Sequence, residues 1–222
     1  MSTVNISEWC ANNIGRSNRH VIREACNIKL ADAAKVVMAI GEYIAPNFTI
    51  DEDNKQTYKN LLTWCLSQGP LDINKGIYLW GNTGTGKTLA LAVLRNVCRY
   101  FNIRADYGGE VHGLAWTTVH ANEICDEYEE NGNLSSWVDI PCLCINDLGT
   151  EPAETLYMGN RRRVLRTILE QRADRADRLT LITSNYPPNA EEISDMYGAR
   201  VVSRINQMFN ICPLFGPDRR NS

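Results

Sequence analysis

The stretch that decides the fold reads Trp80-Gly81-Asn82-Thr83-Gly84-Thr85-Gly86-Lys87-Thr88-Leu89. Residues 81–88 fit the pattern G-x-x-x-x-G-K-S/T, in which glycines let the backbone turn tightly and point successive N–H groups at a phosphate where a helix begins. Lys87 of this pattern reaches the β- and γ-phosphates, and the Thr88 hydroxyl holds Mg²⁺. The stretch predicts a nucleotide-binding loop formed by Gly81, Asn82, Thr83, Gly84, Thr85, Gly86, Lys87, Thr88 and Leu89.

The residues on either side supply the strand and the helix that the pattern requires. The run Gly76-Ile77-Tyr78-Leu79-Trp80 is short and apolar, which is typical of a buried strand. Residues 89–101 are rich in apolar side chains and contain neither proline nor glycine, which favours a helix. A glycine-rich surface turn does not require both neighbours, so the phosphate-binding interpretation is the stronger one.

The composition is that of an ordinary globular chain of 222 residues, long enough for one α/β core and a small accessory region. Neither a membrane span nor a signal peptide is visible, and we expect a cytoplasmic protein. The net charge of −3 excludes a generally basic nucleic-acid coat, although it leaves room for a local basic face. The eight cysteines include no C-x-x-C pair and have no histidine at zinc spacing, so we expect reduced, mostly buried thiols.

Residues 1–75 have the periodicity of helices. Apolar side chains recur at helical spacing from Ala33 to Ile44 and again from Tyr58 to Cys65. Eight basic residues balance eight acidic ones over residues 1–75, which argues against a DNA-binding arm. Pro46-Asn47 marks a break. We therefore predict a helical N-terminal region over residues 1–45, which packs on the core or grips a protein partner, and a core domain over residues 46–222.

Apolar strands alternate with helical segments after the phosphate-binding loop. Further strands are expected at residues 114–119, 141–147, 179–183 and 208–215. Such alternation, beginning with a phosphate-binding loop, indicates a parallel sheet with helices on both faces. The ligand of such a sheet lies beyond the carboxyl ends of the strands, where Gly81, Asp147 and Asn185 all fall.

Four segments together are more specific than the loop alone. They are residues 75–88, Asn146-Asp147-Leu148-Gly149-Thr150-Glu151, Thr183-Ser184-Asn185 and Gly198-Ala199-Arg200-Val201-Val202-Ser203-Arg204. On these segments the chain resembles the AAA+ ATPases of the DnaC-type helicase-loader group and their transposition relatives, the IstB-like proteins, over residues 48–215. The resemblance implies an α/β fold, a three-layer AAA+ P-loop core with a five-stranded parallel sheet, preceded by a small helical N-terminal region. We expect no C-terminal helical lid, and a nucleotide held openly with closure by the neighbouring subunit.

The resemblance assigns residues 146 and 147 to Walker B, where the first acidic residue of the family orients metal-bound water and the second polarises the attacking water. Here the first is Asn146, whose neutral amide can hydrogen-bond Mg²⁺-bound water but brings no negative charge to hold the ion. Asp147 then falls on the catalytic position. In a second register Asp147 is the metal partner and Glu151 the base, but Leu148-Gly149 matches the family in the first. The implied Mg²⁺ contacts, some through water, are Thr88, Asn146 and Asp147.

Asn185 matches the sensor-1 residue of the family, which helps to place the attacking water. Asparagine is also common in turns such as the one before Pro187-Pro188, which is the alternative without a catalytic role. The resemblance thus implies a catalytic set of Asp147, Lys87, Asn185 and Arg204.

Arg204 matches the arginine finger that enters the neighbouring subunit's nucleotide site. A guanidinium supplied in trans is worth on the order of 10³-fold or more in rate. Arg200 shares its face on a continuous helix, unless Gly198 breaks that helix. The alternative is a surface arginine that pairs with Glu191, Glu192 or Asp195.

Residues 161–178 contain seven arginines and an apolar stripe, which together predict an amphipathic helix with a basic start. Its position after Walker B suits contact with single-stranded DNA along a channel between subunits. Asp174 and Asp177 offset the later arginines, and a solvated face explains the pattern equally well. The candidates for DNA contact are Arg161, Arg162, Arg163 and Arg166.

The resemblance implies an ATPase that uses ATP and Mg²⁺ and forms a homo-oligomeric spiral or ring. Its N-terminal helices would grip a DnaB-type replicative helicase, which it loads onto single-stranded DNA. An IstB-like helper that delivers a transposase is the close alternative. Asn146 motivates another alternative, an adaptor that binds ATP and hydrolyses little of it. A small-molecule kinase would explain neither Ser203-Arg204 nor the N-terminal helices.

Overall fold

The computed structural model describes residues 21–219, and its centre is a five-stranded sheet in the order β10-β2-β9-β6-β5. The strands are β2 (Gly76–Trp80), β5 (Thr117–His120), β6 (Cys142–Leu148), β9 (Leu179–Ser184) and β10 (Phe209–Pro213). Every pairing in this sheet is parallel. The predicted five-stranded parallel sheet is therefore confirmed.

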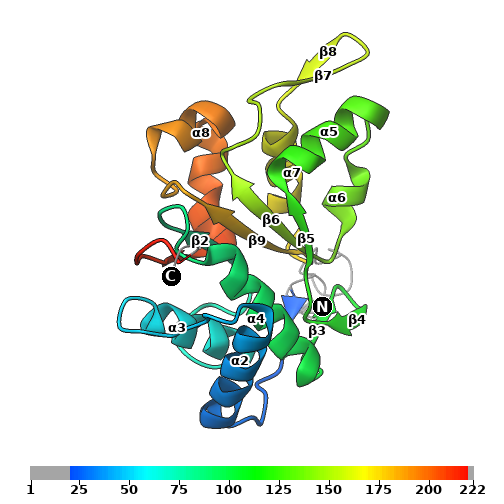
Figure 1. Cartoon of the computed structure of the whole chain (residues 1–222). Coiled ribbons are helices and arrows are strands. Elements are labelled where there is room, and N and C mark those ends of the chain that lie inside the picture. The colour runs from blue at the N-terminus through cyan, green and yellow to red at the C-terminus, as the bar shows by residue number, and fades with distance from the viewer. Residues whose placement is uncertain (1–20, 220–222) are drawn as a thin grey trace, which may run out of the picture.

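Helices cover both faces of the sheet (Figure 1). One face carries α2 (Leu30–Ile44), α3 (Lys55–Cys65) and α4 (Lys87–Tyr100). The other carries α5 (Ala121–Asn131), α6 (Ser135–Asp139), α7 (Val164–Ala173) and α8 (Glu191–Met208). Successive side chains of a strand point to opposite faces, so Ile77 and Leu79 join the core around α4 while Tyr78 joins the core around α8. The predicted three-layer α/β architecture, with the phosphate-binding loop after β2, is confirmed.

The N-terminal part differs from a purely helical region. β1 (Val21–Ile22) lies in the region predicted to be helical, and it pairs antiparallel with β3 (Arg104–Tyr107), which pairs antiparallel with β4 (Val111–Gly113). The buried face of α2, formed by Ala33, Val37 and Gly41, packs into the same core as α4. The helical prediction for residues 1–20 lies outside the described residues, and the boundary at residues 45 and 46 stays a prediction.

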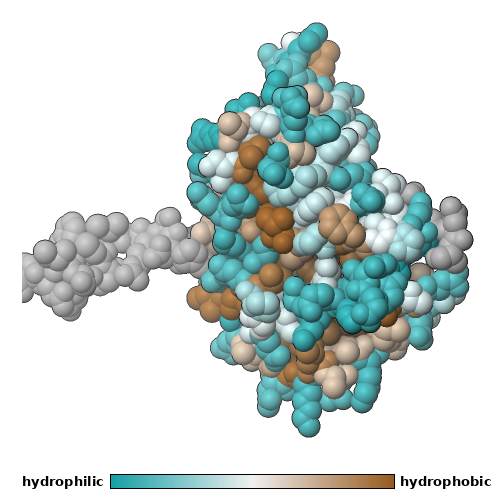
Figure 2. Space-filling model, turned by 90° about the vertical axis from the view of Figure 1, so that its left-hand side faces the viewer, coloured by the Kyte–Doolittle hydropathy of each residue, from teal (hydrophilic) through white to brown (hydrophobic). Residues whose placement is uncertain are grey.

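Residues 155–162 form a hairpin instead of the start of the predicted basic helix. β7 (Thr155–Tyr157) pairs antiparallel with β8 (Asn160–Arg162). Met158 and Gly159 between them have φ values of 46° and 84°, which a right-handed helix does not allow. The hairpin projects from the top of the molecule, where hydrophilic residues dominate the surface (Figures 1 and 2). Helix α7 begins only at Val164, and its predicted apolar stripe of Val164, Leu165, Ile168 and Leu169 is buried.

Two expectations from the composition can be compared with the described residues. All seven cysteines there are free, and all except Cys26 are buried, as predicted; Cys10 lies outside that part of the chain. Burial raises the pKa of the Cys142 and Cys125 thiols to about 11, so both are neutral at physiological pH. Between residues 21 and 219, no helix has the length and apolar character needed to cross a membrane.

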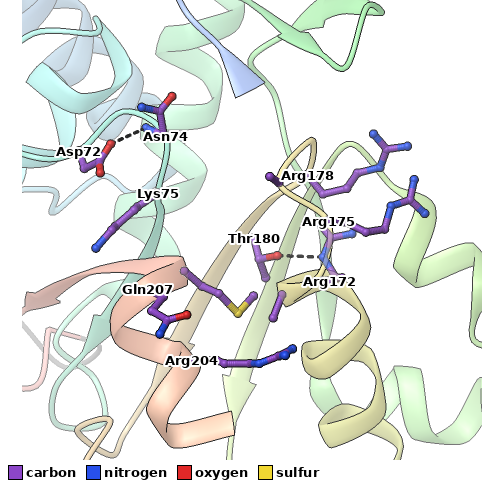
Figure 3. A pocket seen from close by; sticks show the side chains of 12 residues that line it. Asp72, Asn74, Lys75, Arg172, Arg175, Arg178, Thr180, Arg204 and Gln207 are labelled. Atoms are coloured by element: carbon purple, nitrogen blue, oxygen red, sulfur yellow. Dashed lines mark hydrogen bonds between the residues drawn. The ribbon is translucent and has the colours of Figure 1, made fainter. Parts of the chain in front are cut away.

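Arg172, near the end of α7, is 2% exposed and fastens the segment before β6 to β9. Its guanidinium donates to the carbonyl oxygens of Val138 and Ile140 at 2.9 Å each. It also donates to the Leu179 carbonyl at 2.6 Å and to the Thr180 hydroxyl at 2.8 Å, the latter visible in Figure 3. Burial lowers the pKa of Arg172 to about 10, so the side chain remains charged at neutral pH.

We expect Arg172→Met to lower the free energy of unfolding by roughly 3 kcal/mol or more, because each buried acceptor left without a donor costs about 1–3 kcal/mol. Arg175→Met is the matched control. Arg175 pairs with Asp139 and Asp177 near the surface, where an ion pair contributes about 0–1 kcal/mol. Urea denaturation followed by circular dichroism measures both variants, and equal losses would contradict the special role of Arg172.

Candidate functional site

The phosphate-binding loop lines a cavity of about 460 Å³ at the carboxyl ends of the central strands. The loop spans the turn between β2 and α4, as the sequence predicted. Gly84 and Gly86 have φ values of 83° and 89°, which glycine adopts without strain. Beyond the loop, the lining includes His120, Asn122, Asp147, Thr150, Asn185 and Arg219.

Lys87 is 6% exposed, and among residues 21–219 its ammonium donates to three acceptors at this edge of the sheet. They are the carbonyl oxygens of Gly81 at 2.7 Å and Asn82 at 2.9 Å, and Oδ1 of Asn185 at 2.9 Å. Asn185 follows β9 directly, so this last contact joins the ends of two neighbouring strands. The structure thus brings together the predicted phosphate-binding lysine and the predicted sensor residue, with a cation beside the cavity where an anionic ligand is favoured.

The last residues of β6 divide between two cavities. Asn146 is 2% exposed, accepts a hydrogen bond from the Thr183 hydroxyl at 3.3 Å, and lines a cavity of about 170 Å³ together with Thr88. Asp147 lines the larger cavity, which Thr88 also borders. Its backbone is left-handed, with a φ of 56°, and its N–H donates to the Thr183 hydroxyl at 2.9 Å. Side chains alternate along a strand, and the irregular pairing of β6 with β9 between Ile145 and Leu148 adds to this, so the neighbouring residues face different spaces.

Glu151, the base in the second register, is buried against α8. One of its carboxylate oxygens accepts a hydrogen bond from the Tyr197 hydroxyl, and the other accepts one from the Gly149 N–H at 2.9 Å. Burial, with the nearby Glu151 charge, raises the pKa of Tyr197 well above its usual value, so the phenol keeps its proton. These contacts hold Glu151 in the interior, and it does not line the cavity. They favour the first register, in which Asp147 and not Glu151 is the base.

His120 is a lining residue that the sequence did not single out. It ends β5 and is the N-cap of α5, where the Glu123 carboxylate accepts a hydrogen bond from its N–H at 3.2 Å. Its Nδ1 lies 3.5 Å from Oδ2 of Asp147. The sequence could have indicated His120, because it directly follows the predicted strand of residues 114–119 and therefore falls at the same edge of the sheet as Asp147.

The side chains predicted to hold Mg²⁺ are a hydroxyl, an amide and one carboxylate, from Thr88, Asn146 and Asp147. Within the described part of the chain, histidine, cysteine, aspartate and glutamate side chains form no cluster of three or more that could hold a metal ion. Mg²⁺ in phosphate-transfer sites usually takes one or two protein ligands and completes its shell with phosphates and water. The donor set therefore fits a magnesium ion carried with a nucleotide rather than one held by the protein alone.

Three solved structures share this architecture. A structure described as a primosome component from Streptococcus pyogenes serotype M3 is 21% identical, with 77% of this chain and 84% of that chain covered and a TM-score of 0.55. The DnaI structure is 21% identical, with 79% of this chain and 89% of that chain covered and a TM-score of 0.52. The structure of the DnaC helicase loader is 16% identical, with 77% of this chain and 95% of that chain covered and a TM-score of 0.53. The chain therefore shares its fold with these three structures. No family model and no curated protein matches the sequence.

Arg204 lies at the opposite edge of the central sheet, where the parallel strands begin. It lines a cavity of about 480 Å³ with Lys75 and Thr180, which stand at the starts of β2 and β9 (Figure 3). Its guanidinium donates to Oδ1 of Asp174 at 2.8 Å and to the carbonyl oxygen of Glu170 at 3.3 Å. Within one chain Arg204 is thus an ion-paired arginine, and its action in a neighbouring subunit stays a prediction.

The kink of α8 does not separate Arg200 from Arg204. Gly198 is the non-helical residue, with φ 79° and ψ 160°. Because it precedes both arginines, they lie on one uninterrupted helical segment four residues apart, and therefore on one face.

The arginines proposed to contact DNA do not form the single helical face that the sequence predicted. Arg161 and Arg162 belong to β8, Arg163 is the N-cap of α7, and Arg166 lies on α7. Arg161 and Arg163 lie 3.9 and 3.8 Å from the Glu154 carboxylate, and Arg166 pairs with Glu170 at 3.2 Å. The turn at Met158 and Gly159 is the reason for the difference. Contact with DNA stays a prediction.

Proposed function

We propose that this chain binds and hydrolyses ATP and loads a DnaB-type replicative helicase onto single-stranded DNA. The observation that carries the ATPase part is the convergence of Lys87, Thr88, Asp147 and Asn185 on one cavity beside the phosphate-binding loop. The loader part rests on the motifs that resemble the DnaC-type family and on a fold shared with DnaI and the DnaC helicase loader.

Bound ATP with Mg²⁺ would supply the phosphoryl group and a positive charge that offsets the charge of the phosphates. We infer that the loop N–H groups and Lys87 bind the phosphate oxygens, and that Thr88 and Asn146 contact the cation, the latter through water. Asp147 would accept the proton of the water that attacks the γ-phosphorus, and Asn185 would orient that water. The water oxygen would bond to the γ-phosphorus as the bond between the γ-phosphorus and the oxygen of the β-phosphate breaks, which leaves ADP and phosphate.

We expect Lys87→Ala to abolish ATP binding, and Asp147→Asn to retain binding while lowering turnover by roughly a hundredfold or more, since general-base catalysis contributes about 10²–10⁴-fold. Calorimetric titration with ATP and steady-state phosphate release, with and without single-stranded DNA, measure the two effects. Asp126→Asn, an exposed position of α5, is the matched control and should change neither. Turnover that persists in both site variants would reject the assignment of this cavity.

A nucleotide-gated adaptor is the second candidate, because Asn146 is buried and brings no charge to hold the cation. The same assays separate the two functions. ATP binding that depends on Lys87, with wild-type turnover no higher than that of Asp147→Asn, would support the adaptor. A robust wild-type rate that is lost in both variants would remove it.

We propose that the protein assembles into a spiral or ring in which Arg204 acts in trans, exchanging Asp174 for the phosphates of a neighbouring subunit. Arg204→Ala and Asp147→Asn should each be inactive alone and recover part of the activity when mixed, because some interfaces then join an intact finger to an intact cavity. A mixture of Lys87→Ala with Asp147→Asn contains no intact cavity and should recover nothing. Turnover against mixing ratio is the measurement, and no recovery in the first mixture would contradict the trans role.

We further propose that residues 1–45 grip the helicase and that the arginines at 161, 162, 163 and 166 contact single-stranded DNA. The full chain immobilised on a surface should retain a purified DnaB-type helicase and should not retain an IstB-type transposase. Capture of the transposase alone would reject the loader function.

The DNA contact has its own test, in which the wild type is compared with the double variant Arg161→Ala with Arg162→Ala. The variant should bind a labelled single-stranded oligonucleotide more weakly than the wild type, and its affinity should depend less steeply on salt, as expected when phosphate contacts are removed.

A further inference from the structure

The cavity of about 170 Å³ beside Asn146 lies between α4 and the strands β5 and β6. Its lining on the helix side follows one face of α4, with residues at helical spacing. These residues are Thr88, Leu91, Ala92 and Arg95. On the strands it is lined by Thr118, Cys144 and Asn146. Because Thr88 also borders the cavity of about 460 Å³, the two cavities share the residue whose hydroxyl is expected to contact Mg²⁺.

Arg95 brings a positive charge to this smaller cavity, and no carboxylate of residues 21–219 lines it. The Nε atom of Arg95 is buried and has no hydrogen-bond partner among those residues. Long side chains of a helix lean toward its N-terminus, which for Arg95 is the end that carries Thr88. Burial raises the pKa of the Cys144 thiol well above its usual value, and the Arg95 charge opposes this, so the guanidinium lies close to β6.

Asn146 lines the same cavity, at the position where the family resemblance places an acid. It is 2% exposed, and its Oδ1 accepts a hydrogen bond from the Thr183 hydroxyl at 3.3 Å. A carboxylate at this position would attract a cation, whereas the neutral amide brings no charge. The β6 side of Thr88 therefore has a fixed cation, Arg95, and a neutral amide in place of the fixed anion that would hold a metal ion.

The larger cavity also has little negative charge. Within the described part of the chain, Asp147 is the one carboxylate in its lining, and Lys87 is a buried cation beside it. ATP carries more negative charge without a metal ion than in its complex with Mg²⁺, and its attraction to fixed cations grows with that charge. The charges on the two sides of Thr88 therefore favour the nucleotide itself over the ion that accompanies it.

We propose that this chain binds ATP with an affinity that depends little on Mg²⁺. Arg95 and Lys87 supply fixed positive charge on the two sides of Thr88, and Asn146 supplies no charge to hold the ion. Arg95 acts through the charge of the site and does not need to touch the nucleotide. The proposal rests on the proposed function, because it concerns the metal requirement of the same nucleotide site. Occupancy of the site then follows the concentration of ATP, and Mg²⁺ is needed for hydrolysis.

Calorimetric titration of the full chain with AMPPCP, an ATP analogue that is not hydrolysed, tests this in excess Mg²⁺ and in EDTA. For the wild type the two dissociation constants should differ by less than about tenfold, which is the effect of losing one hydrogen bond to a charged group. Asn146→Asp should increase this difference, because a carboxylate attracts the ion and repels the metal-free nucleotide. Arg95→Met, which keeps the length of the side chain, should weaken binding in EDTA more than binding in Mg²⁺.

Arg99→Met is the matched control, because Arg99 is exposed on the same helix, and it should leave both dissociation constants unchanged. A wild type that loses most of its affinity in EDTA would overturn the proposal. Equal behaviour of Arg95→Met and Arg99→Met would overturn it as well. Should Arg95→Met fail to fold in a thermal melt without nucleotide, Asn146→Asp decides: a larger dependence on Mg²⁺ than in the wild type supports the proposal, and an unchanged dependence overturns it.

Failure of the proposed function gives a different result. In that case the wild type binds AMPPCP neither in Mg²⁺ nor in EDTA, or its binding is unaffected by Lys87→Ala in both.

Discussion

The buried ammonium of Lys87 must find acceptors where β2 turns into α4, because a charge removed from water is costly unless it is paired or hydrogen-bonded. It finds the carbonyl oxygens of Gly81 and Asn82 in its own loop and the amide oxygen of Asn185 after β9. One cation thus holds the ends of two adjacent parallel strands at a common point. The lining of the candidate site is built outward from that point.

The conformation of β6 then decides where the two residues predicted to form Walker B lie. Asn146 points into the layer of α4 and is almost fully buried, while Asp147, one residue later in β6, has a left-handed conformation and lines the open cavity. The hydroxyl of Thr183 on β9 contacts both residues, which couples their positions to the same neighbouring strand that carries Asn185. A carboxylate and a neutral amide at adjacent positions therefore meet different surroundings.

Long apolar runs made the central sheet predictable, and short strands did not. The three inner strands of the sheet, β2, β6 and β9, are largely buried and bounded by loops or helices, so their composition alone marks them. β1 has two residues and β8 has three, which is too little for a periodic pattern. Before β8, the turn at Met158 and Gly159 reverses the chain, so Arg161 and Arg162 lie in a strand and not in the helix that the periodicity predicted.

The sequence by itself determined the phosphate-binding loop, the strand and helix beside it, and the edge of the sheet at which Asp147 and Asn185 lie. These features depend on local backbone conformation and on the rule that parallel strands end at a common edge. Only the tertiary structure decided that His120 lies beside Asp147, that Asp174 holds Arg204, and that Arg219 crosses the loop to Asp51. Such contacts join residues 27 to 168 positions apart, and no local pattern encodes them because they arise only when the layers pack together.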